Sequence, residues 1–190
     1  MTEESDEELY RRMRSGDKAA LAELYERREP GLFRYALHMS GSRSVAEEVT
    51  HEVFYRLIGP GLRFKEGAGS LEAYLHGVAR NLLREAARMK QREPELDTSR
   101  ETAAAEDVLA GLMAEEAANA LQRAVQELPE EYREAVVFCD LEEKSYDDAA
   151  RLMACPVGTV RSRLHRARGL LAAKLRRFKN SPRAGSEVAR

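Results

Sequence analysis

The sequence contains no tryptophan and only two cysteines, Cys139 and Cys155, among its 190 residues. Two cysteines do not make a disulfide scaffold, and this scarcity is typical of proteins in a reducing compartment. No apolar run approaches the roughly 20 residues of a membrane span. The acidic N-terminal residues also lack the apolar core of a signal peptide. We therefore expect a cytoplasmic protein without membrane insertion.

Residues that favour β-structure are also scarce, and aromatic residues make up only 6% of the chain. Alanine, leucine, glutamate and arginine dominate instead, which favours helix over sheet. Hydrophobic residues reach 43%, enough for a folded core rather than a disordered chain. We expect an all-α protein of two small helical domains joined by an acidic linker, the second domain being a helix-turn-helix.

The net charge of −2 conceals a strong asymmetry along the chain. Residues 1–8 carry five acids and no base, whereas residues 149–180 carry nine bases and no acid. A basic surface confined to one segment attracts polyanions and is typical of nucleic-acid binding. The sequence thus indicates a nucleic-acid partner for the C-terminal part.

Glycine and proline divide the first 92 residues into predicted helices. We expect Pro30 and Gly31 to end one helix and Gly59 to Gly61 to end another. Ser44 and Glu47 have the spacing of a capping box, which predicts a helix start at Ser44. Ser70 is a good N-cap for the next helix. The apolar stripes expected on these two helices comprise Val45, Val49, Val53 and Leu57, and then Leu71, Leu75, Val78 and Leu82.

Residues 93–106 are acidic and poor in large apolar side chains, so we interpret them as a linker. A helix over about residues 108–128 is predicted to open the second domain, with Val108, Leu112 and Leu121 as its main apolar contacts. Pro129 stands at a helix start, where its missing N–H is tolerated. Tyr132, Val136, Val137 and Leu141 follow with helical spacing. The predicted domains span residues 1–92 and 107–180, and residues 181–190 form a tail.

The most informative segment runs from Ser145 to Arg168. Ser145 is a candidate cap for a short helix, with Ala149, Leu152 and Met153 facing inward, and residues 154–156 break that helix. A second helix from Val157 would bury Val160, Leu164, Ala167 and Leu171, which recur at helical spacing. Two helices around a tight turn, the second rich in arginine and hydroxyl residues, form the helix-turn-helix arrangement. The alternative is a solvated basic helix without a specific partner, and the absence of acids over 149–180 favours DNA.

The stretches from Leu128 to Val136 and from Cys155 to Arg168 resemble the promoter-reading domain of bacterial sigma factors, most closely those of the extracytoplasmic-function group. The resemblance implies a helix-turn-helix that reads the minus-thirty-five promoter element. It also implies the candidate DNA contacts Thr159, Arg161, Ser162, Arg163, His165, Arg166 and Arg168.

The stretch from Val45 to Leu57 is similar to the helix with which this family docks on the clamp of RNA polymerase. His51 stands where the family usually has glutamine. The resemblance implies the candidate docking residues Glu47, Glu48, His51, Glu52 and Phe54. The alternative is an ordinary amphipathic helix with solvated glutamates.

The stretch from Phe64 to Leu83 resembles the loop and helix that open the minus-ten element. Residues 63–92 hold seven bases against three acids, which favours an electrostatic groove for melted DNA. The candidate contacts are Arg63, Phe64, Lys65, Tyr74, Arg80, Asn81 and Arg84. For Tyr74, packing in the core is as strong an interpretation as stacking on a base.

Other classes of site have little support in the sequence. The two cysteines lack Cys-x-x-Cys spacing, so we expect inert thiols and no metal. No phosphate-binding glycine loop, nucleophile elbow or acid–base carboxylate pair is present, so we expect neither an enzyme nor a cofactor or small-molecule substrate. The resemblance implies core RNA polymerase, promoter DNA and an anti-sigma protein as partners. The rival hypotheses are a stand-alone DNA-binding regulator and a sigma-like adaptor that sequesters a partner.

Overall fold

The computed structural model describes residues 4–60, 63–65, 67, 69–92 and 110–180. Over these residues all regular structure is helical and no strand occurs, which confirms the all-α prediction. The elements are α1 (Asp6–Arg14), α2 (Lys18–Ser40), α3 (Arg43–Ile58), α4 (Leu71–Arg92), α5 (Ala110–Gln126), α6 (Glu130–Val136), the π-helical turn η1 (Val137–Leu141), α7 (Tyr146–Leu152) and α8 (Val157–Asn180). No helix in this part of the chain is long and apolar enough to cross a membrane.

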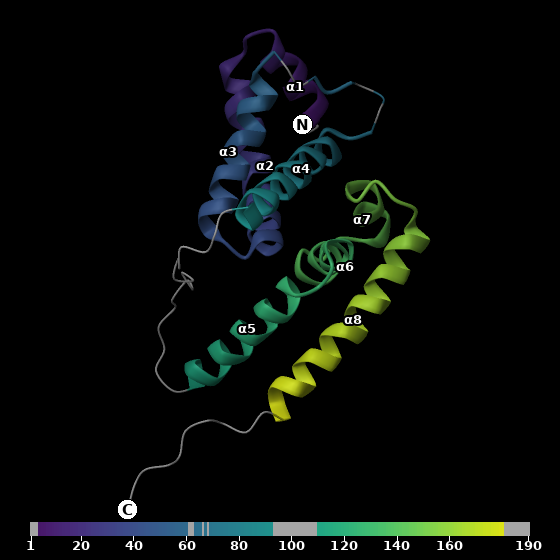
Figure 1. Ribbon diagram of the computed structural model, residues 1–190. Coiled ribbons are helices and arrows are strands. Elements are labelled where there is room, and N and C mark those ends of the chain that lie inside the picture. The colour runs from purple at the N-terminus through teal and green to yellow at the C-terminus, as the bar shows by residue number, and fades with distance from the viewer. Residues whose placement is uncertain (1–3, 61–62, 66, 68, 93–109, 181–190) are drawn as a thin grey trace, which may run out of the picture.

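Helices α1 to α4 pack together as the first domain (Figure 1). The sequence interpretation did not include α1, whose start is a capping box: Ser5 accepts from the amide of Glu8, and Glu8 accepts from the amide of Ser5. Asp6 is buried and forms ion pairs with Arg27 and Arg28 of α2. These contacts hold the N-terminal end of α1 against the middle of α2.

The prediction that Pro30 and Gly31 end a helix is wrong, because α2 continues through both residues to Ser40. An internal proline costs about 3 kcal/mol, since one hydrogen bond is lost and the ring meets the preceding turn. Leu24 and Leu32, on either side of Pro30, are both buried in the same core. Each buried leucine contributes about 1.5–3 kcal/mol, so the burial of this continuous face outweighs the proline.

The predicted capping box at Ser44 is also wrong. Helix α3 begins at Arg43, and its N-cap is Ser42, whose hydroxyl accepts from the amide of Val45 at 3.4 Å. Glu47 pairs instead with Arg43 at 2.9 Å. Three other predictions here are confirmed. Helix α3 ends before Gly59, Ser70 caps α4 through the amide of Ala73, and the stripes are buried except for the half-buried Val45.

Helices α5 to α8 form the second domain. Leu121 is 39% exposed, so its predicted role as a main contact is wrong, while Val108 and the Leu112 side chain lie outside the described residues. Pro129 precedes α6 as its N-cap. Val136 and Val137 are buried as expected, but Leu141 is 37% exposed. The π-helical turn η1 changes the periodicity after Val136, which rotates Leu141 away from the core.

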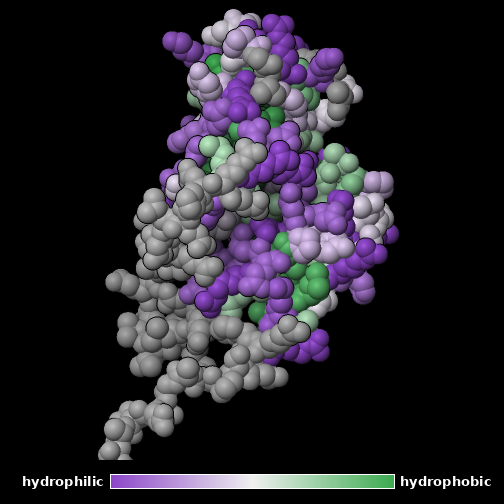
Figure 2. Space-filling model, viewed as in Figure 1, coloured by the Kyte–Doolittle hydropathy of each residue, from purple (hydrophilic) through white to green (hydrophobic). Residues whose placement is uncertain are grey.

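The two domains share one continuous hydrophobic core. Helix α4 packs on α7, and α2 packs on α5, α6 and η1. The outward face seen in Figure 2 is mainly hydrophilic, with small hydrophobic patches. The predicted linker, residues 93–106, and the predicted tail, residues 181–190, lie outside the described residues. The domain boundaries therefore stay predictions.

Candidate functional site

The helix-turn-helix consists of α7, a short turn and α8. Ser145 caps α7 by accepting from the amide of Asp148 at 3.1 Å. The chain reverses at Ala154, whose φ of 50° lies in the left-handed region, and the amide of Cys155 donates to the carbonyl of Ala150 at 3.0 Å. Helix α8 then starts at Val157, as predicted.

The inner faces of both helices are buried as the periodicity predicts. These residues are Ala149 and Leu152 of α7, Met153 at its C-cap, and Val160, Leu164, Ala167 and Leu171 of α8, all at most 8% exposed. This packing fixes the rotation of α8 about its axis. The polar side chains of its first half are therefore directed away from the core.

Arg161, Ser162 and His165 occupy the exposed side of α8. The guanidinium of Arg161 lies 5.6 Å from the ring centroid of Tyr146 in α7, a cation–π distance. The hydroxyl of Ser162 donates to the carbonyl of Thr159 at 3.0 Å, and Thr159 itself is half-buried. Arg161 is thus oriented by a contact that leaves it at the surface.

Three further arginines of α8 contact polar groups of α6 and η1. Arg163 pairs with Glu131 at 3.3 Å, and Arg166 lies 3.5 Å from the Tyr132 hydroxyl. Arg168 pairs with Asp140 at 2.5 Å, which raises the pKa of the guanidinium. Residues 149–180 contain no acid of their own, but Glu131 of α6 and Asp140 of η1 pair with two of their arginines. The sequence interpretation missed this, because pairing of α8 with α6 and η1 is a tertiary contact.

The candidate minus-ten residues of the loop before α4 fall into two groups. Arg63 and Lys65 are exposed, whereas Phe64 is 8% exposed and packs against the rings of Tyr10 and Tyr74 at centroid distances of 5.7 Å. Tyr74 is half-buried, and burial raises the pKa of its hydroxyl. The rings of Phe64 and Tyr74 therefore pack against each other within the first domain. This arrangement agrees with the interpretation of Tyr74 as a core residue.

Two of the candidate minus-ten residues on α4, Arg80 and Arg84, contact the second domain. The Nε of Arg80 donates to Oε1 of Glu134 at 2.7 Å, and its Nη2 donates to the carbonyl of Leu152 at 2.7 Å. Arg84 pairs with Glu130 at 2.7 Å. Asn81 lies between them in the chain and is exposed. Both arginines thus pair with acids of α6, but only Arg80 is withdrawn from solvent, because the Arg84 side chain is 49% exposed.

The candidate docking residues lie along α3. Glu47, Glu48 and His51 are exposed, whereas Glu52 is half-buried and pairs with Arg56 at 2.6 Å. Phe54 is buried against Tyr25, with ring centroids 4.6 Å apart. Glu47, Glu48, His51 and Glu52 therefore lie on the outer side of α3, and Phe54 packs in the core beneath this helix.

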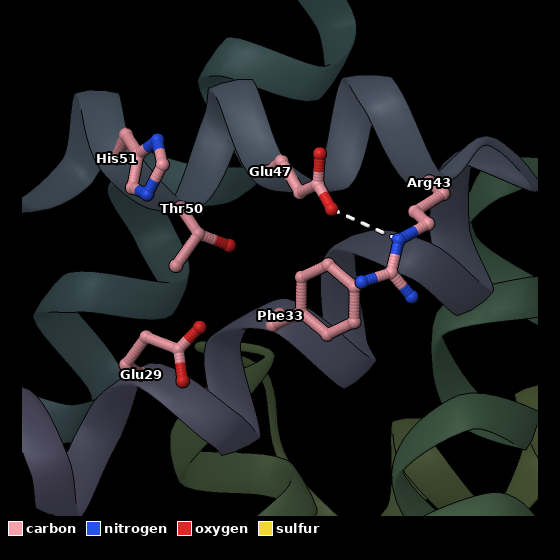
Figure 3. Close-up of a pocket in the computed structure, with 6 residues that line it drawn as sticks. All are labelled: Glu29, Phe33, Arg43, Glu47, Thr50 and His51. Carbon is pink, nitrogen blue, oxygen red and sulfur yellow. Dashed lines mark ion pairs between the residues drawn. The ribbon is translucent and has the colours of Figure 1, made fainter.

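A hollow of about 260 Å³ between α2 and α3 lies beside this surface (Figure 3). Its lining residues are Glu29, Phe33, Arg43, Glu47, Thr50 and His51. The guanidinium of Arg43 lies over the Phe33 ring at 5.5 Å and pairs with Glu47, as Figure 3 shows. Sequence reasoning missed Glu29, Phe33 and Arg43 because they join the site only through the pairing of α2 with α3.

The cysteines show no sign of special chemistry. Both are free and half-buried, and burial raises the pKa of each thiol, which lowers its reactivity. Within the described residues no group of three or more His, Cys, Asp or Glu side chains is arranged to hold a metal ion.

Two family models match the chain. The sigma-70 region 2 model matches residues 24–93, and the sigma-70 region 4 model matches residues 118–171. The first covers helices α2 to α4 up to the predicted linker. The second covers most of α5 to α8, including the helix-turn-helix.

Several curated proteins are similar over most of their length. The RNA polymerase sigma-H factor of Pseudomonas aeruginosa is 31% identical over 185 residues, covering 88% of this chain and 92% of that protein. The ECF RNA polymerase sigma factor SigM of Mycobacterium tuberculosis is 34% identical over 182 residues, covering 91% and 86%. With SigE of Mycolicibacterium smegmatis the identity is 32%, and the match spans 62% of that longer protein.

Two solved structures show the same fold. One is the sigma factor RpoE in complex with the anti-sigma factor NepR from Bartonella quintana, with a TM-score of 0.62, 24% identity, and coverage of 82% of this chain and 96% of that one. The other is CnrH in complex with the cytosolic domain of CnrY, with a TM-score of 0.64, 20% identity, and coverage of 92% and 99%.

The helical fold and the two matched regions define a sigma-70-type factor. The chain belongs to the extracytoplasmic-function, or ECF, family of RNA polymerase sigma factors.

Proposed function

We propose that this protein binds core RNA polymerase and directs it to promoters by reading the minus-thirty-five element with α8 and melting the minus-ten element with residues 63–92. One observation carries the proposal: the polar side of the first half of α8 is exposed. This part of the helix lies within the match to the sigma-70 region 4 model. The polymerase performs the chemistry, so we assign no catalytic residue to this chain.

The exposed side of α8 has the chemistry for reading duplex DNA. Arginine recognises guanine through two hydrogen bonds in the major groove, and serine and histidine reach base edges or phosphates. We assign base-edge contacts to Ser162 and His165, which lie opposite the buried stripe. We assign phosphate contacts to Arg161 and Arg163 at the two sides of the helix. Arg166 and Arg168 extend the basic surface, and their contacts with Tyr132 and Asp140 orient them.

The acidic surface of α3 is proposed to dock on the polymerase. Glu47, Glu48 and His51 are exposed on one helix, so a basic partner surface can approach them without unfolding any element. The hollow beside them, lined by Glu29 and Glu47, would accept a basic side chain of the partner. Opposite charges of this kind speed association and fix the orientation of the partners.

For the minus-ten element we propose contacts from the basic residues around α4. Arg63 and Lys65 are exposed and offer phosphate contacts to a single strand. Asn81 is exposed on α4 and offers hydrogen bonds to a base. Phe64 is buried and anchors the loop in the core, so we do not assign it a base contact. Tyr74 is half-buried and is the aromatic residue to which we assign stacking on a base.

An anti-sigma protein is proposed as the regulator of this factor. One solved structure with this fold is the sigma factor RpoE in complex with the anti-sigma factor NepR, and another is CnrH in complex with the cytosolic domain of CnrY. The partner for this chain would act in the same compartment as the polymerase, which we propose to be the cytoplasm.

The proposal is tested by selecting DNA with the reconstituted complex. Core RNA polymerase with and without the protein is incubated with fragments of the source genome, and the bound fragments are sequenced. We expect enrichment, only with the protein present, of fragments that share two upstream motifs at a fixed spacing. Enrichment of a single motif, independent of the polymerase, would instead identify a stand-alone DNA-binding regulator.

A further inference from the structure

Phe64, in the loop before α4, is attached to helix α1. Helix α1 lies beside the start of α4 (Figure 1). Tyr10 of α1 is 5% exposed, and its hydroxyl oxygen accepts a hydrogen bond from the backbone amide of Phe64 at 3.2 Å. The rings of the two residues meet edge to face, with centroids 5.7 Å apart. Both the backbone and the side chain of Phe64 are therefore bound to one residue of α1.

A second residue of α1 holds the chain where the loop enters α4. Oε1 of Glu7 accepts from the backbone amide of Leu71, the first residue of α4, at 3.0 Å. The first amides of a helix have no partner within the helix, and a carboxylate is favoured at this end. Glu7 and Tyr10 are three residues apart, so they lie on the same face of α1. One face of α1 thus contacts the chain at Phe64 and again at Leu71.

Helix α1 is itself firmly attached to the first domain. Leu9 and Met13 are buried in the core. Asp6 forms ion pairs with Arg27 and Arg28 of α2, and a capping box stabilises the first turn of α1. The helix is therefore a fixed support for the residues that it contacts.

The support matters because Phe64 stands between two basic residues. Arg63 and Lys65 are exposed, whereas Phe64 is buried. This alternation is typical of an extended segment, in which successive side chains point to opposite sides. Anchoring Phe64 therefore directs both cations of this basic segment, residues 63–65, toward solvent. Fixed cations bind a polyanion more tightly than mobile ones, because less conformational freedom is lost on binding.

We propose that Glu7 and Tyr10 are positioning residues for the minus-ten contact. By holding the chain on α1, they keep the basic segment in a fixed arrangement for single-stranded DNA. Neither residue is assigned a DNA contact, so they act on the placement of the two cations and not on the number of phosphate contacts. The positioning role rests on the proposed DNA binding by residues 63–92, whereas the attachment to α1 rests on the contacts above alone.

The first test follows backbone amides by NMR-detected hydrogen exchange in the full chain without DNA. Tyr10→Phe keeps the ring but removes the acceptor of the Phe64 amide, so this amide should exchange faster, on the order of tenfold. Glu7→Ala should have the same effect on the Leu71 amide. Glu7→Gln retains a side-chain oxygen as acceptor and should keep that amide slow. If either amide exchanges as in the parent, the corresponding residue of α1 does not hold the chain.

The second test measures affinity for a mixed-sequence single-stranded DNA oligonucleotide, by fluorescence anisotropy at several salt concentrations. Tyr10→Phe should weaken binding about two- to tenfold, the cost of ordering one long side chain on binding. The log–log salt dependence should keep its slope, because the phosphate contacts are the same in number. Arg63→Ala with Lys65→Ala should instead make the slope shallower, by about 0.7 for each lost contact. Tyr25→Phe, at a half-buried tyrosine of α2, is the matched control and should bind as the parent does.

Combining the variants separates positioning from a general loss of stability. If Tyr10 acts through the two cations, Tyr10→Phe should have no further effect on affinity once Arg63 and Lys65 are replaced by alanine. A loss of the same size in both backgrounds would overturn the positioning role of Tyr10. Glu7→Ala and Glu7→Gln have the same net charge, so only the alanine variant, which lacks the acceptor, should bind more weakly than the parent.

The two tests also distinguish this proposal from the proposed function. Equal affinity of the parent and of Arg63→Ala with Lys65→Ala would show that the basic segment does not bind DNA, while amide exchange would still report its attachment to α1. Faster exchange of the Phe64 amide in Tyr10→Phe without weaker binding, when the two cations do contribute to affinity, would overturn the positioning role and leave the DNA contact in place.

Discussion

Tyr35 of α2 donates its hydroxyl hydrogen to Glu134 of α6 at 2.8 Å, across 99 residues of sequence. Both side chains are buried, and burial together with the nearby carboxylate raises the pKa of Tyr35 well above its usual value. The phenol therefore stays protonated and keeps its role as a donor. This bond ties the first domain to the second at the centre of their shared core.

The first prediction concerns that bond. Tyr35→Phe keeps the ring but leaves one acceptor position of the buried Glu134 carboxylate without its donor, so we expect the free energy of unfolding to fall by about 1–3 kcal/mol. Urea denaturation followed by circular dichroism measures it. Tyr55→Phe is the control, because Tyr55 is 74% exposed and should change little. Equal stabilities of the two variants would show that the bond adds nothing.

The second prediction concerns pH. Burial lowers the pKa of His76 to about 4, against the opposing effect of a hydrogen bond to the Glu72 carbonyl. Between pH 6.5 and about 4 the unfolded chain takes up a proton that the folded chain does not, so the unfolding free energy falls as the pH falls. The full loss from this group amounts to about 3 kcal/mol.

Denaturation curves at a series of pH values test this assignment. His76→Gln should show a shallower loss of stability over that range than the parent. His165→Gln, at an exposed position on α8, should retain the parent slope. Parallel curves for His76→Gln and the parent would remove His76 as the source.

The third prediction concerns α8 and duplex DNA. Arg161→Ala and Arg163→Ala should each weaken promoter binding and make the log–log salt dependence shallower by about 0.9, the amount expected for one lost phosphate contact. Arg176→Ala is the control, since it removes the same charge about four turns further along the helix. An unchanged slope would take either residue off the list of phosphate contacts.

The fourth prediction concerns docking on the polymerase. Glu48→Lys and His51→Ala should reduce affinity for core RNA polymerase in the absence of DNA, with the charge reversal having the larger effect, on the order of tenfold or more. Glu85→Lys reverses an exposed acid on α4 and should bind as the parent does. If the α3 variants bind normally but no longer support transcription, the assignment of α3 to docking is wrong.

Periodicity and capping predicted those parts of the fold that depend on neighbouring residues. The buried stripe of α8, the Ser145 cap and the break near Ala154 are all local features, and each is confirmed. Pro30 misled the interpretation because its local cost is offset by tertiary burial on both sides. The π-helical turn after Val136 has no simple periodic signal, so the exposure of Leu141 was missed.

The sites show the same division between local and tertiary information. The exposed positions on α3 and α8 follow from helical spacing alone. The partners of Arg80, Arg84 and Arg168 do not, because Glu134, Glu130 and Asp140 are 54, 46 and 28 residues away in the chain. Residue type marked these arginines as candidates for DNA contact, but only the packing of the helices shows which acids they meet.

Run-off transcription tests the central claim most directly. The protein is added to core RNA polymerase on linear templates that carry upstream regions of the source genome, and transcripts are mapped at their start sites. We predict transcripts that require the protein and start downstream of a shared pair of motifs, and their loss with Glu48→Lys. A protein that co-elutes with core polymerase yet yields no transcript from any template would contradict the account and indicate an adaptor that sequesters its partner.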